Sequence, residues 1–155
     1  MKISRMAIAI LTLLVAVTAQ IQVSYAASPA EPSRRAAPKS LSVRALDVAI
    51  SKKGFPYQYG ATGPRRFDCS GLMQYSFRVA GRRIPRTAEQ QFHYAHHVPA
   101  THRKRGDLVF FLKGRNVYHV GFYAGAGKIW HAPKPNRKIR VEKIWTRNVR
   151  YGRVS

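Results

Sequence analysis

The sequence predicts an α+β fold, with helices in its first half and antiparallel strands in its second. Apolar residues recur at helical spacing in two segments before residue 82. After residue 107 the pattern changes to short apolar runs separated by glycine-containing turns, which is typical of strands joined by hairpins. Helices and strands do not alternate regularly, so the pattern favours an α+β domain over parallel βαβ units.

The first 26 residues are predicted to be a signal peptide. Lys2 and Arg5 precede an almost wholly apolar segment, 6–19, and small residues before position 27 favour cleavage after Ala26. The apolar run is short for a membrane helix, so we expect no stable span in the mature form. A retained N-terminal anchor is the alternative, because the run extends weakly through Ile21 and Val23.

Residues 27–40 are rich in alanine, serine, proline and arginine and are predicted to be a flexible linker before one domain, 41–155. The chain has 28 basic and 6 acidic residues, a formal charge of +22. Two of the basic residues and none of the acidic ones lie in the signal peptide, which leaves +20. We expect this monomeric domain to attract anionic envelope polymers. Nucleic-acid binding is not expected, because the basic residues are dispersed and no nucleic-acid motif accompanies them.

The first predicted helix covers residues 41–53. Its apolar positions recur every three to four residues, either Ser40 or Ser42 can cap it, and Gly54 can end it. A short aromatic, extended stretch, 55–60, and a turn-rich loop, 61–66, follow.

The second predicted helix begins at Cys69, the only cysteine of the chain. Asp68 is a good N-cap, Gly81 can end the helix, and Leu72, Ser76 and Val79 are predicted to share its buried stripe. The helix dipole favours the thiolate of a cysteine in the first turn. A single cysteine cannot form an intrachain disulfide, and in an exported protein this favours a chemical role. The alternative is a buried cysteine that acts as a small apolar side chain.

A third helix is predicted over 87–97, where Thr87 and Gln90 fit a capping box, followed by polar loop to Lys104. The predicted strands are 108–112, 117–124, 128–132, 139–144 and 149–154. A turn centred on Ala126 would place His119 opposite position 133, close to His131, provided that the register does not slip by one residue. Two unrelated strand histidines are the alternative.

A possible metal site lies in the third helix. Glu89, His93 and His97 are spaced by four residues, with His96 adjacent, and such spacing could bind zinc. A solvated polar face explains the same pattern, and we expect no metal here.

Several short motifs lie in order between residues 42 and 154. They are Gly54-Phe55-Pro56-Tyr57-Gln58-Tyr59-Gly60, Asp68-Cys69-Ser70-Gly71-Leu72, Ile84-Pro85-Arg86-Thr87-Ala88, Gly106-Asp107-Leu108-Val109-Phe110-Phe111, His119-Val120-Gly121-Phe122-Tyr123 and His131-Ala132-Pro133. In this order and spacing they resemble the NlpC-type family of papain-like cell-wall cysteine peptidases. The resemblance implies a papain-like α+β fold in which the nucleophile helix packs on an antiparallel sheet.

The resemblance also implies a role for each matching residue. Cys69 would be the nucleophile, His119 the general base and then acid, and His131 the residue that orients His119. Tyr57 would assist the oxyanion, and two residues that flank the nucleophile, Asp68 and Ser70, would hold the substrate's free amine and acyl chain. No cofactor or metal is implied.

The implied activity is hydrolysis of peptidoglycan stem peptides by an exported enzyme, located in the periplasm, outside the cell or in the cell wall. The bond cut most often in this family joins γ-D-glutamate to a diamino acid. The alternatives are a peptidase that cuts cross-links, an amidase or toxin with the same fold, and an inactive protein that binds the wall or other polyanions. We expect the basic surface to serve in place of the wall-binding modules that many family members carry.

Overall fold

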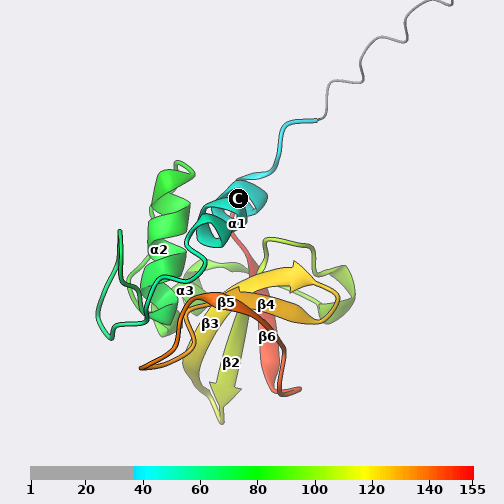
Figure 1. The fold of residues 1–155 in the computed structure, drawn as a ribbon. Coiled ribbons are helices and arrows are strands. Elements are labelled where there is room, and N and C mark those ends of the chain that lie inside the picture. The colour runs from blue at the N-terminus through cyan, green and yellow to red at the C-terminus, as the bar shows by residue number, and fades with distance from the viewer. Residues whose placement is uncertain (1–36) are drawn as a thin grey trace, which may run out of the picture. The chain divides into compact units, whose positions relative to one another are not determined.

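The computed structural model describes residues 37–155, so the predicted signal peptide and most of the predicted linker lie outside the described residues. Three helices and six strands make up the described part (Figure 1). Their bounds are α1 (Leu41–Ser51), α2 (Cys69–Val79), α3 (Ala88–Tyr94), β1 (His96–Val98), the short 3-10 helix η1 (Ala100–His102), β2 (Leu108–Lys113), β3 (Asn116–Gly125), β4 (Lys128–His131), β5 (Arg140–Lys143) and β6 (Val149–Arg153).

The strands form one antiparallel sheet in the order β1-β6-β2-β3-β4-β5. This confirms the predicted α+β class. The strands β2, β3 and β4 are successive hairpins in the middle of the sheet, where side chains alternate between its two faces. The sheet is therefore the scaffold that carries the two histidines of the sequence motifs, His119 on β3 and His131 on β4.

The main core lies between the helices and one face of the sheet. It combines Leu46 of α1 and Phe77 of α2 with Phe110 and Phe122 of the sheet, all fully buried. Trp130 ties α1 to β4, because its indole Nε1 donates a hydrogen bond of 2.8 Å to the carbonyl oxygen of Ala49. The papain-like expectation of a nucleophile helix packed on an antiparallel sheet is confirmed.

A second, smaller cluster lies on the other face of the sheet. Its buried members are Val109, Phe111, Tyr123, Ile129 and Tyr151, none of which belongs to a helix. Phe110 faces the helices while its neighbours Val109 and Phe111 face away, as the two-residue period of a strand requires.

Two details of the helix predictions are wrong. Val79 is 55% exposed, because the buried arc of α2 is centred on Met73 and Phe77 and the last turn carries Val79 past its edge. The third helix ends at Tyr94 rather than at residue 97, and the next residues form β1, which pairs with β6. This edge strand is polar and mostly exposed, so it has no apolar alternation by which it could be predicted.

The other elements agree with the sequence patterns. Ser40 caps α1, and the predicted capping box of Thr87 and Gln90 is present on α3. Each predicted strand is found to within one or two residues at either end. No helix within residues 37–155 has the length and apolar character needed to cross a membrane.

Candidate active site

Cys69 is the first residue of α2 and lies against the central strand β3. Asp68 caps the helix in extended conformation and accepts a hydrogen bond of 2.6 Å from the backbone N–H of Gly71. The thiol is mostly buried and in contact with the backbone of Val120, the residue that follows His119. The sequence therefore places its only thiol between a helix N-terminus and the histidine strand.

Asp68 also anchors Arg86, which precedes α3. The guanidinium donates two hydrogen bonds to the carboxylate, of 3.1 Å from Nη1 and 2.5 Å from Nη2, and a third of 2.9 Å to the hydroxyl of Ser70. The backbone N–H of Gly60 donates another to the same carboxylate. Asp68 thus joins the chain before the nucleophile, the start of α2 and the start of α3 at one point.

The two histidines meet as the predicted register requires. Phe122 pairs with Trp130 and Tyr123 with Ile129, which centres the hairpin on Ala126, with one irregularity at its tip. His119 and His131 then lie diagonally across the strand pair, and the distance from His119 Nε2 to His131 Nδ1 is 2.7 Å.

Gly121 provides the room for this contact. It lies two residues from His119 on the same face of β3, and a Cβ at this position would come within 3.0 Å of the Cβ of His131. A side chain here would push β4 and its histidine away from β3.

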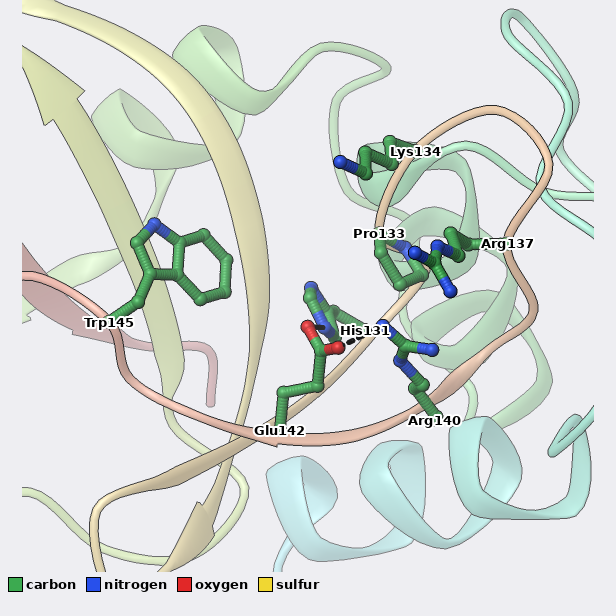
Figure 2. A pocket seen from close by; sticks show the side chains of 7 residues that line it. All are labelled: His131, Pro133, Lys134, Arg137, Arg140, Glu142 and Trp145. Atoms are coloured by element: carbon green, nitrogen blue, oxygen red, sulfur yellow. Dashed lines mark hydrogen bonds and ion pairs between the residues drawn. The ribbon is translucent and has the colours of Figure 1, made fainter.

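Glu142 on β5 extends the histidine pair. Its Oε2 lies 2.9 Å from His131 Nε2, and its Oε1 forms an ion pair with Arg140 (Figure 2). Burial alone would raise the pKa of Glu142, but hydrogen bonds from Arg140 and His131 lower it, so the carboxylate stays ionised. The site therefore contains a continuous chain of side chains, Glu142, His131 and His119.

This chain fixes the tautomers of both histidines. An ionised carboxylate can only accept hydrogen bonds, so the proton of neutral His131 is on Nε2 and its Nδ1 is an acceptor. His119 must then donate from Nε2, which leaves its Nδ1 without a proton. The remaining nitrogen of His119 is thus able to act as a base.

Burial keeps both histidines neutral. It lowers the pKa of His119 to about 3, with the charge of His131 as a smaller cause, and it also lowers the pKa of His131. Burial raises the pKa of the Cys69 thiol, and the charge of Asp68 raises it further. Backbone N–H groups at the helix start lower this pKa, as expected, but they only partly offset burial. The resting pair is a thiol and a neutral imidazole.

Cys69 opens into a groove of about 460 Å³. Its other lining residues are Tyr57, Tyr59, Gly60, Asp68, Ser70, Arg86, Thr87, Ala88 and Tyr118. Burial raises the pKa of Tyr57, so its hydroxyl keeps its proton and can donate a hydrogen bond. The structure brings Tyr57, Asp68 and Ser70 to one groove beside Cys69, as the sequence motifs suggested.

Trp145, in the loop between β5 and β6, covers the histidine pair. Its ring stacks on Phe111 with centroids 4.2 Å apart, and its centroid lies 5.7 Å from that of His119 and 5.6 Å from that of His131. An apolar ring at this position keeps water from competing for the hydrogen bond between the two imidazoles.

The residues considered for zinc have other partners. Glu89 Oε1 lies 3.1 Å from His93 Nε2, and its Oε2 accepts a hydrogen bond from the N–H of Val117. His97 belongs to β1 and bonds to the carbonyl oxygen of Phe92. Within residues 37–155, no group of three or more histidine, cysteine or acidic side chains is arranged to hold a metal ion.

Three residues of the site were not predicted from the sequence: Arg86, Glu142 and Trp145. Arg86 lies within the motif that begins at Ile84, but nothing in the sequence indicates that it pairs with the carboxylate of Asp68, 18 residues earlier. Glu142 alternates with Val141 in a predicted strand, a pattern that indicates only an outward-facing carboxylate.

Comparison with known proteins identifies relatives for most of the described domain. The family model described as "NlpC/P60 family" matches residues 54–152. A probable endopeptidase of Corynebacterium glutamicum is 41% identical over 110 residues, which cover 70% of this chain and 52% of that protein. A gamma-D-glutamyl-L-lysine dipeptidyl-peptidase of Bacillus subtilis is 41% identical over 91 residues, which cover 57% of this chain and 31% of that protein. The chain thus matches about half or less of the length of these curated relatives.

Solved structures show the same fold. The P60 domain of an antigen from M. avium subspecies paratuberculosis aligns with a TM-score of 0.66 and 30% identity, over 73% of this chain and 93% of that one. The NlpC/p60 domain of the peptidoglycan hydrolase SagA aligns with a TM-score of 0.66 and 28% identity, over 73% and 98% of the two chains.

Proposed function

This chain belongs to the NlpC/P60 family, and we propose that it is an exported cysteine endopeptidase that hydrolyses amide bonds in the stem peptides of peptidoglycan. The observation that carries the proposal is a cysteine at a helix start, next to a strand whose histidine is oriented by His131 and Glu142. A thiol, a base and an orienting group are what acyl transfer through a covalent intermediate requires.

The bond that we propose is the one between γ-D-glutamate and a diamino acid. The relative from Bacillus subtilis, named as a gamma-D-glutamyl-L-lysine dipeptidyl-peptidase, supports this choice. The groove beside Cys69 is lined by Asp68 and Ser70. The family resemblance implies that these two residues hold the free amine and the acyl chain of such a substrate. The Asp68 carboxylate already accepts bonds from Arg86 and two backbone N–H groups, so a substrate amine would share it.

In the first step, Cys69 Sγ attacks the amide carbon while its proton passes to Nδ1 of His119. Both residues are neutral at rest, so the proton leaves as the sulfur–carbon bond forms rather than beforehand. Glu142 stabilises the imidazolium by holding His131 in the tautomer that accepts from His119.

The tetrahedral intermediate carries an oxyanion near the start of α2. The first N–H groups of a helix have no intrahelical acceptor, so the N–H of Cys69 is available to it. The protonated hydroxyl of Tyr57 is a second donor in the same groove.

Collapse of the intermediate breaks the carbon–nitrogen bond. His119 gives its proton to the leaving amine, which leaves a thioester on Cys69. A water molecule then attacks the thioester, with His119 again as base, and releases the acid and the free thiol.

The proposal also covers the N-terminal residues of the chain. We propose that residues 1–26 direct export and are removed, and that residues 27–40 link them to a peptidase domain that covers 41–155. The protein would then act in the periplasm, outside the cell or in the cell wall.

The test is mass spectrometry of defined muropeptides after incubation with the protein and with Cys69→Ala. We expect new fragments that end in γ-D-glutamate with the protein and none with the variant. Fragments split at a cross-link would be consistent with Cys69 as the nucleophile but would exclude the proposed bond as the one that is cut. Equal cleavage by Cys69→Ala, or none by the folded and reduced protein, would exclude the proposed peptidase.

A further inference from the structure

A second cavity, of about 270 Å³, borders His131 of the histidine pair. It is lined by His131, Pro133, Lys134, Arg137, Arg140, Glu142 and Trp145 (Figure 2). The groove of Cys69 and this cavity share no lining residue: the cysteine borders one and His131 borders the other.

The cavity has more positive charge than its own carboxylate can balance. Glu142 is its only acidic lining residue, and both of its oxygens are engaged, one by Arg140 and one by His131. Within residues 37–155, no carboxylate lies within ion-pair distance of Lys134 or Arg137. The Nε of Arg140 is buried and has no hydrogen-bond partner among the described residues. The wall thus presents unused donors and two unpaired cations.

Backbone hydrogen bonds anchor the loop that carries these two cations. The loop between β4 and β5 is tied to the stretch before α2, where Tyr57 N–H donates to the carbonyl oxygen of Arg137 at 2.9 Å and Ile139 N–H donates to that of Phe55 at 2.9 Å. On the opposite side of the cavity in Figure 2, the ring of Trp145 provides an apolar wall. A cationic wall on an anchored backbone that faces an aromatic ring distinguishes this cavity from a merely basic surface.

We propose that this cavity binds a carboxylate carried by the leaving-amine part of the peptide substrate. The inference rests on the proposed function, in which His119 protonates the leaving amine and the acyl part lies in the groove of Cys69. The leaving part then extends toward His131, and a free α-carboxylate on its diamino acid would meet Lys134 and Arg137. An arginine guanidinium binds a carboxylate through two parallel hydrogen bonds.

The kinetic test compares L-Ala-γ-D-Glu-L-Lys with a free carboxylate at its lysine and the same tripeptide as the lysine amide. We expect kcat/KM for the free acid to exceed that for the amide by about tenfold, the effect of one charge-assisted hydrogen bond. Arg137→Gln and Lys134→Gln should reduce this ratio toward one while cleavage of the amide is unchanged. Arg82→Gln removes the same charge at the far end of α2 from Cys69 and should keep the ratio.

A binding test separates this inference from the proposed function. In full-length Cys69→Ala, the free acid should change the fluorescence of Trp145 more strongly than the amide does, and Arg137→Gln should abolish the difference. Trp145→Phe identifies the signal, because the other tryptophan, Trp130, is bonded inside the core.

The outcomes are distinct. Equal cleavage and equal binding of acid and amide would overturn the carboxylate site and leave the peptidase intact. Preferential binding of the acid without any cleavage would support the site and overturn the peptidase. Absence of binding to Cys69→Ala, or equal saturation by inorganic phosphate, would overturn the site.

Discussion

Glu142 decides which nitrogen of each paired histidine carries a proton. Its carboxylate accepts from His131 Nε2, which makes His131 Nδ1 the acceptor for His119 and leaves His119 Nδ1 free to act as a base. Glu142 does not border the groove of Cys69, so it acts through His131 as a positioning residue.

Glu142→Ala is therefore expected to lower kcat by about tenfold to a hundredfold, below the full contribution of a general base. Glu142→Gln should recover much of the loss, because its amide oxygen can still accept from His131. Steady-state kinetics with nitrogen NMR of the imidazoles would measure both effects. The surface variant Asp47→Ala, which removes an exposed carboxylate paired with Lys39, is the control. Equal losses in the Ala and Gln variants would contradict the assignment of tautomers.

Burial of neutral His119 makes the stability of the domain depend on pH. The pKa of His119 is about 3 in the folded protein and about 6.5 when unfolded, so between these values only the unfolded chain takes up the proton. The contribution of neutral His119 to the free energy of unfolding is thus fully present above pH 6.5, and it is lost as the pH decreases toward 3.

The expected loss from His119 between pH 7.5 and pH 5 is about 2 kcal/mol in the free energy of unfolding. Denaturant unfolding of the protein and of His119→Asn at both pH values would isolate this contribution. His102→Asn, at an exposed histidine of η1, should behave as the unmodified protein does. If the free energy of unfolding of His119→Asn decreased by the same amount between the two pH values, a group other than His119 would be responsible for the pH dependence.

The start of α2 controls the reactivity of the thiol. Asp68 caps the helix and pairs with Arg86, but its charge also raises the pKa of Cys69. Asparagine caps helices about as well as aspartate, so Asp68→Asn should keep the cap and lose the charge.

We expect Asp68→Asn to shift the alkylation of Cys69 by iodoacetamide to lower pH and to cost about 1–3 kcal/mol of stability from the partly exposed ion pair. Asp107→Asn is a matched control, because buried Asp107 binds Arg153 through hydrogen bonds of 2.7 and 2.8 Å and lies outside the groove of Cys69. It should lose stability without any change in alkylation. A shift of alkylation to higher pH in Asp68→Asn would contradict the role given to its charge.

At the level of elements, the sequence predicted most of what positions the site. The turn at 125–127 determined the register of β3 and β4, and from this register the contact between His119 and His131 followed. The strand β1 was not predicted, because it is joined to β6 by backbone hydrogen bonds and its side chains show no pattern.

The remaining parts of the site could not be predicted from the sequence because they depend on packing between distant segments. Arg86 reaches Asp68 only after α3 has docked, and Glu142 reaches His131 only because β5 is next to β4. The net protonation of Cys69 could not be predicted for the same reason, since the extent of its burial is a property of the whole fold.

At the scale of the whole molecule, the charge of +22 suggests how the protein would reach its substrate. We propose that the basic surface holds the domain on anionic wall polymers. Binding of Cys69→Ala to isolated walls should then fall steeply between 0.15 M and 1 M salt, as the screening length decreases from about 8 Å to about 3 Å. A sedimentation assay would measure it, and binding that salt leaves unchanged would contradict an electrostatic mode.

The most direct test of the central claim is to trap the covalent intermediate. Turnover of L-Ala-γ-D-Glu-L-Lys would be quenched with acid within milliseconds, and the digested protein would be analysed by mass spectrometry. Attack by Cys69 predicts the mass of the L-Ala-γ-D-Glu acyl group on the peptide that contains Cys69, removable by hydroxylamine and absent in Cys69→Ala. Turnover by Cys69→Ala, or an acyl group on another residue, would contradict the account.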